Sequence, residues 1–71
     1  MSNTAEISDQ KIRNALKKLA PSLNDHDVVM AGWVNLVRGR MANEQISFET
    51  AMALVSGQVL NLEAQFKAAR S

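Results

Sequence analysis

Large apolar residues recur in steps of four and three over the last third of the chain. This repeat is typical of a helix that packs one face against another helix. The repeat predicts one long helix over about residues 47–69, with Ser47 as its N-cap and basic residues in its last turn. The residues of this seam are Phe48, Met52, Val55, Val59, Leu62, Phe66 and Ala69.

One position could interrupt this helix. Gly57 lies between Val55 and Val59, and a glycine inside a helix costs about 1 kcal/mol relative to alanine. A kink at Ser56–Gly57 would divide the segment into two short helices. A close approach of another backbone would explain the glycine equally well. A strip of small residues and leucine passes through it and contains Ala53, Gly57, Leu60 and Ala64.

The middle of the chain has the same spacing of apolar residues. It predicts a second helix over about residues 26–42, capped by Asn24 or Asp25 and ended by a left-handed Asn43. Its apolar face is broader than one partner helix can cover, because further apolar residues adjoin the repeat. The repeat consists of Met30, Val34, Val37 and Met41, and the adjoining residues are Val29, Trp33 and Leu36.

The first third predicts a shorter helix over about residues 9–19. Ser8 can accept a hydrogen bond as its N-cap, and Pro21 ends it because the residue before a proline avoids the helical region. Leu23 is the one large apolar residue of the polar connector that follows. Residues 1–7 are expected to form a flexible tail, which leaves residues 8–71 as a single helical domain.

These elements predict an all-α fold, a helical hairpin with a long C-terminal helix. The chain has 71 residues, no cysteine and one histidine. A core this small supplies only about 3–5 kcal/mol, and neither disulfides nor thiolate metal sites are available to add to it. We therefore expect a homodimer, assembled as a helical bundle in which a second chain completes the apolar seam.

The surplus apolar surface predicts a small non-enzymatic protein-binding module of the regulator, inhibitor or adaptor and chaperone type. The general form resembles that of small helical-hairpin regulators of bacteria, phages and plasmids. Such a module would dock an apolar helical face on a larger protein. The predicted partner or dimer interface consists of Met30, Trp33, Val34, Val37, Met41, Phe48, Met52, Val55, Val59, Leu62 and Phe66.

The alternative is a small dimeric nucleic-acid-binding regulator. Phosphate contacts need basic side chains on one surface, and a dimer would double the set. Against it, the net charge is only +1, and no helix displays the arginine and amide side chains that read base edges. The residues of this alternative site are Lys11, Arg13, Lys17, Lys18, Arg38 and Arg40.

Catalysis is not expected. His26 between Asp25 and Asp27 is the one candidate cluster, but immediate neighbours on a helix point in different directions and make a poor proton relay. The cluster also lacks the glycine turn of a calcium loop. We expect no cofactor, no metal and no small-molecule substrate. The polar N-terminus and the short apolar runs predict a cytoplasmic protein without a membrane span.

Overall fold

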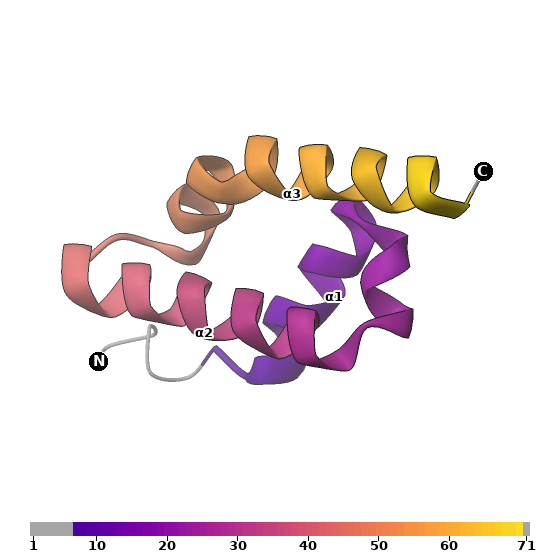
Figure 1. Cartoon of the computed structure of the whole chain (residues 1–71). Helices are drawn as coiled ribbons and strands as arrows, with labels where there is room; N and C mark the ends of the chain where they lie inside the picture. Colours follow the sequence, from indigo (N-terminus) through magenta and orange to yellow (C-terminus); the bar gives the residue numbers. More distant parts are fainter. Residues whose placement is uncertain (1–6, 71) are drawn as a thin grey trace.

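The computed structural model describes residues 7–70 and contains three α-helices and one 3₁₀ helix (Figure 1). They are α1 (Asp9–Leu19), η2 (Pro21–Asp25), α2 (Asp27–Glu44) and α3 (Phe48–Arg70). No strand occurs within residues 7–70. The predicted all-α fold with three helices is therefore confirmed. Of the predicted tail, residues 1–6 lie outside the described part, whereas Ile7 packs against the core.

Helix α1 begins and ends where the sequence predicted. The Ser8 hydroxyl accepts a hydrogen bond from the Lys11 amide at 3.1 Å, so Ser8 is the N-cap. The amide of Ala20 donates to the Leu16 carbonyl at 2.8 Å and closes the last turn. Pro21 then takes the first position of η2, where its missing N–H leaves no gap in the hydrogen bonding.

The predicted cap of α2 by Asn24 or Asp25 is wrong. Both residues belong to η2, and the N-cap of α2 is His26, whose side chain makes no capping hydrogen bond. The amide of His26 instead donates to the Leu23 carbonyl at 3.1 Å, at the end of η2. Most of the predicted connector is thus a short helix, which His26 alone separates from α2.

The predicted left-handed Asn43 is also wrong, because α2 continues to Glu44 and the left-handed residue is Gln45 (φ 54°, ψ 45°). Arg40 and Glu44 form an ion pair one turn apart at 3.1 Å, which favours the two extra helical residues. Ser47 caps α3 as predicted and accepts a hydrogen bond from the Thr50 amide at 3.1 Å. Helix α3 is continuous through Gly57.

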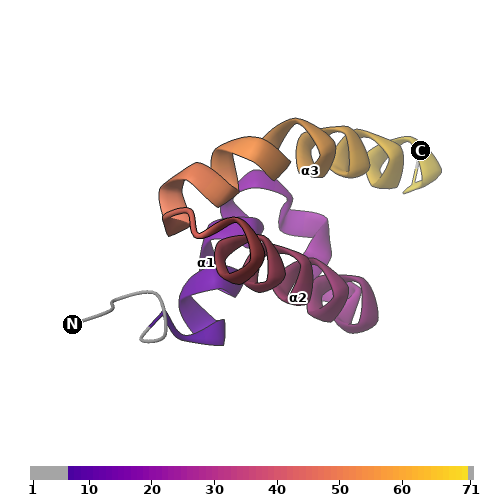
Figure 2. The same ribbon diagram turned by 90° about the vertical axis from the view of Figure 1, so that its left-hand side faces the viewer.

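Helices α2 and α3 run in opposite directions, and α1 crosses both (Figures 1 and 2). The predicted hairpin is present, but it is not an isolated pair. Helices α1 and η2 each pack against both α2 and α3. The molecule is elongated, with extents of 47 × 19 × 16 Å.

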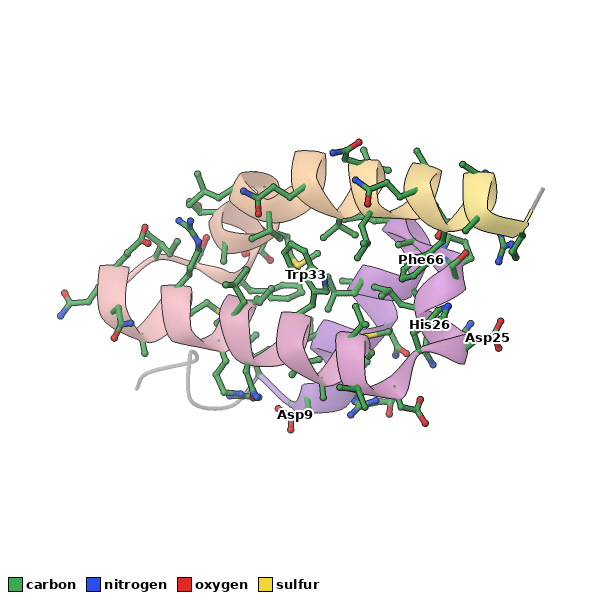
Figure 3. The ribbon with its side chains drawn as sticks, viewed as in Figure 1. Asp9, Asp25, His26, Trp33 and Phe66 are labelled. Carbon is green, nitrogen blue, oxygen red and sulfur yellow. The ribbon has the colours of Figure 1, made fainter. Side chains whose placement is uncertain are left out.

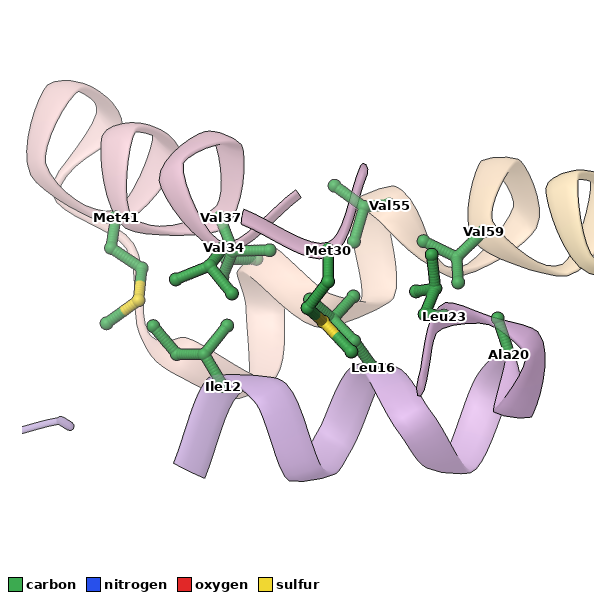
Figure 4. Close-up of a cluster of buried hydrophobic side chains, with 11 residues drawn as sticks. Ile12, Leu16, Ala20, Leu23, Met30, Val34, Val37, Met41, Val55 and Val59 are labelled. Atoms are coloured by element: carbon green, nitrogen blue, oxygen red, sulfur yellow. The ribbon is translucent and has the colours of Figure 1, made fainter. Parts of the chain in front are cut away.

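The core lies where the three helices and η2 meet (Figure 4). On α3 its most buried positions follow steps of four residues, a row inclined to the helix axis and typical of helices that cross at an angle. Ala51 and Glu63 therefore take core positions that the predicted seam lacked, whereas Ala69 is exposed. The buried apolar residues are Ile12, Leu16, Ala20, Leu23, Met30, Val34, Val37, Met41, Ala51, Val55 and Val59.

Candidate protein-binding surface

Six of the eleven residues predicted for an interface are buried in the chain's own core. None of them is more than 3% exposed, because α1 and η2 cover the apolar arc of α2 that was assigned to a second molecule. They are not available to a partner while the chain keeps this fold. The six are Met30, Val34, Val37, Met41, Val55 and Val59. The other five, which pack against the core and are half-buried, are Trp33, Phe48, Met52, Leu62 and Phe66.

Two of the half-buried residues, Phe48 and Met52, line an open groove between α1 and the first half of α3. The groove has a volume of about 430 Å³. Its walls are mostly apolar, and its polar side chains are one lysine, one glutamate and one serine. The lining residues are Ala15, Lys18, Leu19, Phe48, Glu49, Met52, Ala53 and Ser56. We refer to this feature as the α1–α3 groove.

One edge of the α1–α3 groove is basic. The Nζ atom of Lys11 lies 5.6 Å from the centre of the Phe48 ring, within the range of a cation–π contact. Lys18 lies two turns further along α1 and lines the same groove. Within residues 7–70, neither lysine forms an ion pair. An acidic group on a bound partner could therefore approach both amines without breaking an internal contact.

Of the other three half-buried residues, Trp33 and Phe66 lie between α2 and α3 (Figure 3), and Leu62 packs against the core without lining this groove. Trp33 projects from α2 toward α3 and covers part of the core. Near the start of α2, the ring of His26 stacks on that of Phe66, with centroids 4.3 Å apart and planes 5° from parallel. Phe66 is therefore occupied by a contact within the chain.

The basic residues of the alternative nucleic-acid site do not form one surface. The Arg38 guanidinium donates to Asp9 Oδ1 at 3.1 Å and to the Ile7 carbonyl at 2.9 Å. Arg40 pairs with Glu44. On α1, Lys11 and Lys18 border the groove, whereas positions 13 and 17 lie on the opposite flank by helical geometry. Arg13 and Lys17 are half-buried there.

A buried carboxylate joins η2 to α3. Glu63 is 6% exposed; Oε1 accepts from the Ser22 amide at 2.9 Å, and Oε2 accepts from the Ser22 hydroxyl at 3.0 Å. Arg70 lies 3.8 Å from the same carboxylate. The hydrogen bond from the Ser22 amide is the main cause that lowers the pKa of Glu63, and burial opposes it. The described residues leave no buried polar side-chain atom without a partner.

The predicted cluster around His26 lies at the junction of η2 and α2. Asp25 and His26 are both exposed, and in Figure 3 Asp25 points away from the stacked His26–Phe66 pair. Within residues 7–70, no three histidine or acidic side chains gather in a way that could hold a metal ion. No helix in that range has the length and apolar character that crossing a membrane requires.

Comparisons of the chain with protein-family models, with curated proteins and with solved structures gave no match.

The sequence predicted two of the eight groove residues as interface residues, Phe48 and Met52. It missed the contribution of α1, although Ala15 and Leu19 stand four residues apart on one side of that helix. The missing step was the crossing of α1 over the first half of α3, for which the sequence carries no local signal. Glu63 had a usable signal, because a carboxylate stands between Leu62 and Phe66 inside the apolar seam.

Proposed function

We propose that this chain is a small non-enzymatic protein-binding module, and that the α1–α3 groove is its docking site. The observation that carries the proposal is an open apolar groove with a basic edge. Apolar side chains from one face of a partner helix would enter between Leu19, Phe48 and Met52. An acidic residue of the same partner helix would lie beside Lys11 and Lys18. Such a module would act as an inhibitor, adaptor or chaperone of the protein that it binds.

Helix-in-groove binding fits the dimensions of the site. A volume of about 430 Å³ accommodates a few large side chains rather than a whole protein surface. Because the groove is formed by two helices of the core, it is largely formed before binding. Little ordering would therefore oppose association.

The proposal can be tested by filling the groove. Ala15 is half-buried on α1 and lines the groove, so Ala15→Arg places a long side chain across it. Ala42→Arg introduces the same residue at an exposed position near the end of α2 and is the matched control. Circular dichroism would establish that both variants are folded. We expect affinity capture from the native cell, read by mass spectrometry, to recover a protein with the wild type and with Ala42→Arg but not with Ala15→Arg.

The alternative function, a dimeric nucleic-acid-binding regulator, predicts a different outcome. Nucleic acid would then be recovered in place of a protein, its binding would weaken steeply with salt, and Lys17→Ala with Lys18→Ala would reduce it. The ion pairs of Arg38 and Arg40 favour the protein-binding proposal. Equal capture by Ala15→Arg and by the wild type would refute the groove as the docking site.

A further inference from the structure

Helix α3 exposes a long face that carries no charge. In Figures 1 and 2, α1, η2 and α2 all lie on one side of α3, and none of the described chain covers the opposite side. We call this the α3 outer face. It consists of ten exposed residues. The exposed charged residues of α3, Glu49, Lys67 and Arg70, lie beyond one edge of this face, where Glu49 and Lys67 are about 20° around the helix from Leu60. The ten are Thr50, Ala53, Leu54, Gly57, Gln58, Leu60, Asn61, Ala64, Gln65 and Ala68.

The lack of charge is unusual for a surface helix, which ordinarily presents charged residues to water. The exposed positions of α1 include Asp9, Lys11 and Lys18, and those of α2 include Asp27 and Glu44. Depletion of charge, together with exposed large apolar residues, is the composition of an interface centre. Leu54 and Leu60 supply the apolar part, each 51% exposed.

The α3 outer face is symmetrical about Gly57. Leu54 lies three residues before it and Leu60 three residues after it, about 60° to either side around the helix. A two-fold axis through Gly57, perpendicular to α3, would therefore place Leu54 of one chain opposite Leu60 of another. Gly57 would lie at the crossing point, where two helix backbones approach most closely. A Cβ atom at this position meets nothing within 4 Å inside the chain, so the space around it is open to a partner.

We infer that a second copy of this chain covers the α3 outer face, in an antiparallel α3–α3 pair whose two-fold axis passes through Gly57. An isologous interface of this kind requires a self-complementary patch. The α3 outer face meets that requirement for two reasons. It contains no charged residue that would repel the same face of a second chain, and the two-fold axis places Leu54 of each chain opposite Leu60 of the other. This surface adjoins the α1–α3 groove at Ala53, which belongs to both, but Leu54, Gly57 and Leu60 lie outside the groove and the inference does not depend on the proposed function.

The size of the α3 outer face limits the area that an α3–α3 pair can bury. Residues 50–68 extend for about 27 Å along the helix. A strip about 12 Å wide, the diameter of a helix with its side chains, covers about 320 Å² on each chain and about 650 Å² over both. Stable complexes bury about 1,200–2,000 Å². The dimer is therefore weak and reversible, and concentrations from about 1 µM to 1 mM cover the range in which such a pair dissociates.

Sedimentation equilibrium on the full chain tests whether the pair forms. We expect the mass to rise from 7.8 kDa toward twice that value as the concentration increases from about 1 µM to 1 mM. Leu60→Glu and Leu54→Glu should each keep the chain monomeric, because a charge would be buried opposite a leucine. Val28→Glu is the matched control, since Val28 is 86% exposed on α2, and it should dimerise like the wild type.

Disulfide formation tests the antiparallel register. The chain has no cysteine, so only introduced thiols can react. An equal mixture of Leu54→Cys and Leu60→Cys variants should oxidise to the mixed dimer. Either variant alone should remain largely uncrosslinked, because its two thiols would be offset by about 9 Å along the axis, beyond the ~7 Å limit. A wild type that stays monomeric at about 1 mM, dimers that persist in both glutamate variants, or crosslinking between like positions would each overturn the inference.

Discussion

Replacing Gly57 by alanine tests whether α3 is a continuous helix with open space at this position. Gly57 lies inside a continuous helix, its φ is negative, and an added Cβ meets nothing within 4 Å. The methyl group therefore gains no contact and makes no clash, and the effect on the isolated chain reduces to helix propensity. Alanine should raise the free energy of unfolding by about 0.8–1.0 kcal/mol. For a domain of this size that corresponds to an increase in Tm of about 4–8 °C.

Urea denaturation followed by far-ultraviolet circular dichroism measures this change. It should be done at about 1 µM, at the lower end of the range expected for dissociation of the α3–α3 pair. Gly32→Ala on α2 is the matched control, since Gly32 is also helical, exposed and open to an added Cβ. We expect both variants to shift the urea midpoint upward by similar amounts without changing the m-value. A lower midpoint for Gly57→Ala alone would refute the straight, open helix at this position.

The same variant should have the opposite effect on self-association. At the crossing point of two helices a methyl group holds the backbones apart and weakens packing along the contact. Gly57→Ala should therefore weaken the dimer several-fold while stabilising the monomer, and Gly32→Ala should leave the dimer unchanged. A chain in which alanine at position 57 stabilises both states would show that nothing approaches α3 closely there.

Three further predictions concern the fold itself. Leu16→Ala should lower the free energy of unfolding by about 2–5 kcal/mol, a large part of the total for so small a core, whereas Leu36→Ala at a 42% exposed position should change it little in the same urea titration. Glu63→Gln should flatten the pH dependence of Tm. The pKa of Glu63 is lowered in the folded chain, so its carboxylate stabilises the fold above the ordinary pKa of 4.5, and this stabilisation is lost as the pH falls through the folded pKa. The Tm values of the variant and the wild type should therefore converge at low pH. Arg38→Ala should cost less than about 1 kcal/mol, decreasing with salt, because its pair with Asp9 is solvent-exposed, and hydrogen exchange should report the loss at the start of α1.

The sequence predicted best where the signals were local. The bounds of α1 follow from a serine cap and a proline, each of which acts on its own backbone, and both were correct. The end of α2 was less well determined, because asparagine tolerates a left-handed conformation better than glutamine does, yet the left-handed residue is Gln45 and not Asn43. The ion pair between Arg40 and Glu44 favoured continuing the helix to Glu44. Only the three-dimensional contacts could decide between the two positions.

The core shows why the rest could not be predicted from spacing alone. An apolar repeat predicts that one face of a helix is buried, but it does not predict whether the residues that bury this face belong to the same chain or to another. Here the cover comes from α1, because Ile12 and Leu16 are fully buried where α1 packs against α2 and α3. These two side chains cover residues that the repeat predicted for an interface with a partner, among them Val37 and Val59.

This packing determines which surfaces of α3 remain exposed. Because α1, α2 and η2 all pack against one side of α3, the apolar seam of that helix is used internally. What is left for other molecules is the α1–α3 groove on one flank and the uncharged α3 outer face, which adjoins the groove at Ala53. The two surfaces differ in chemistry: the groove is lined by charged side chains and by half-buried apolar ones such as Phe48, whereas the outer face has only small, amide and leucine side chains. A groove with charge on one edge discriminates between partners, and a face without charge can pair with its own image, so one 71-residue chain has room for both a partner and a copy of itself.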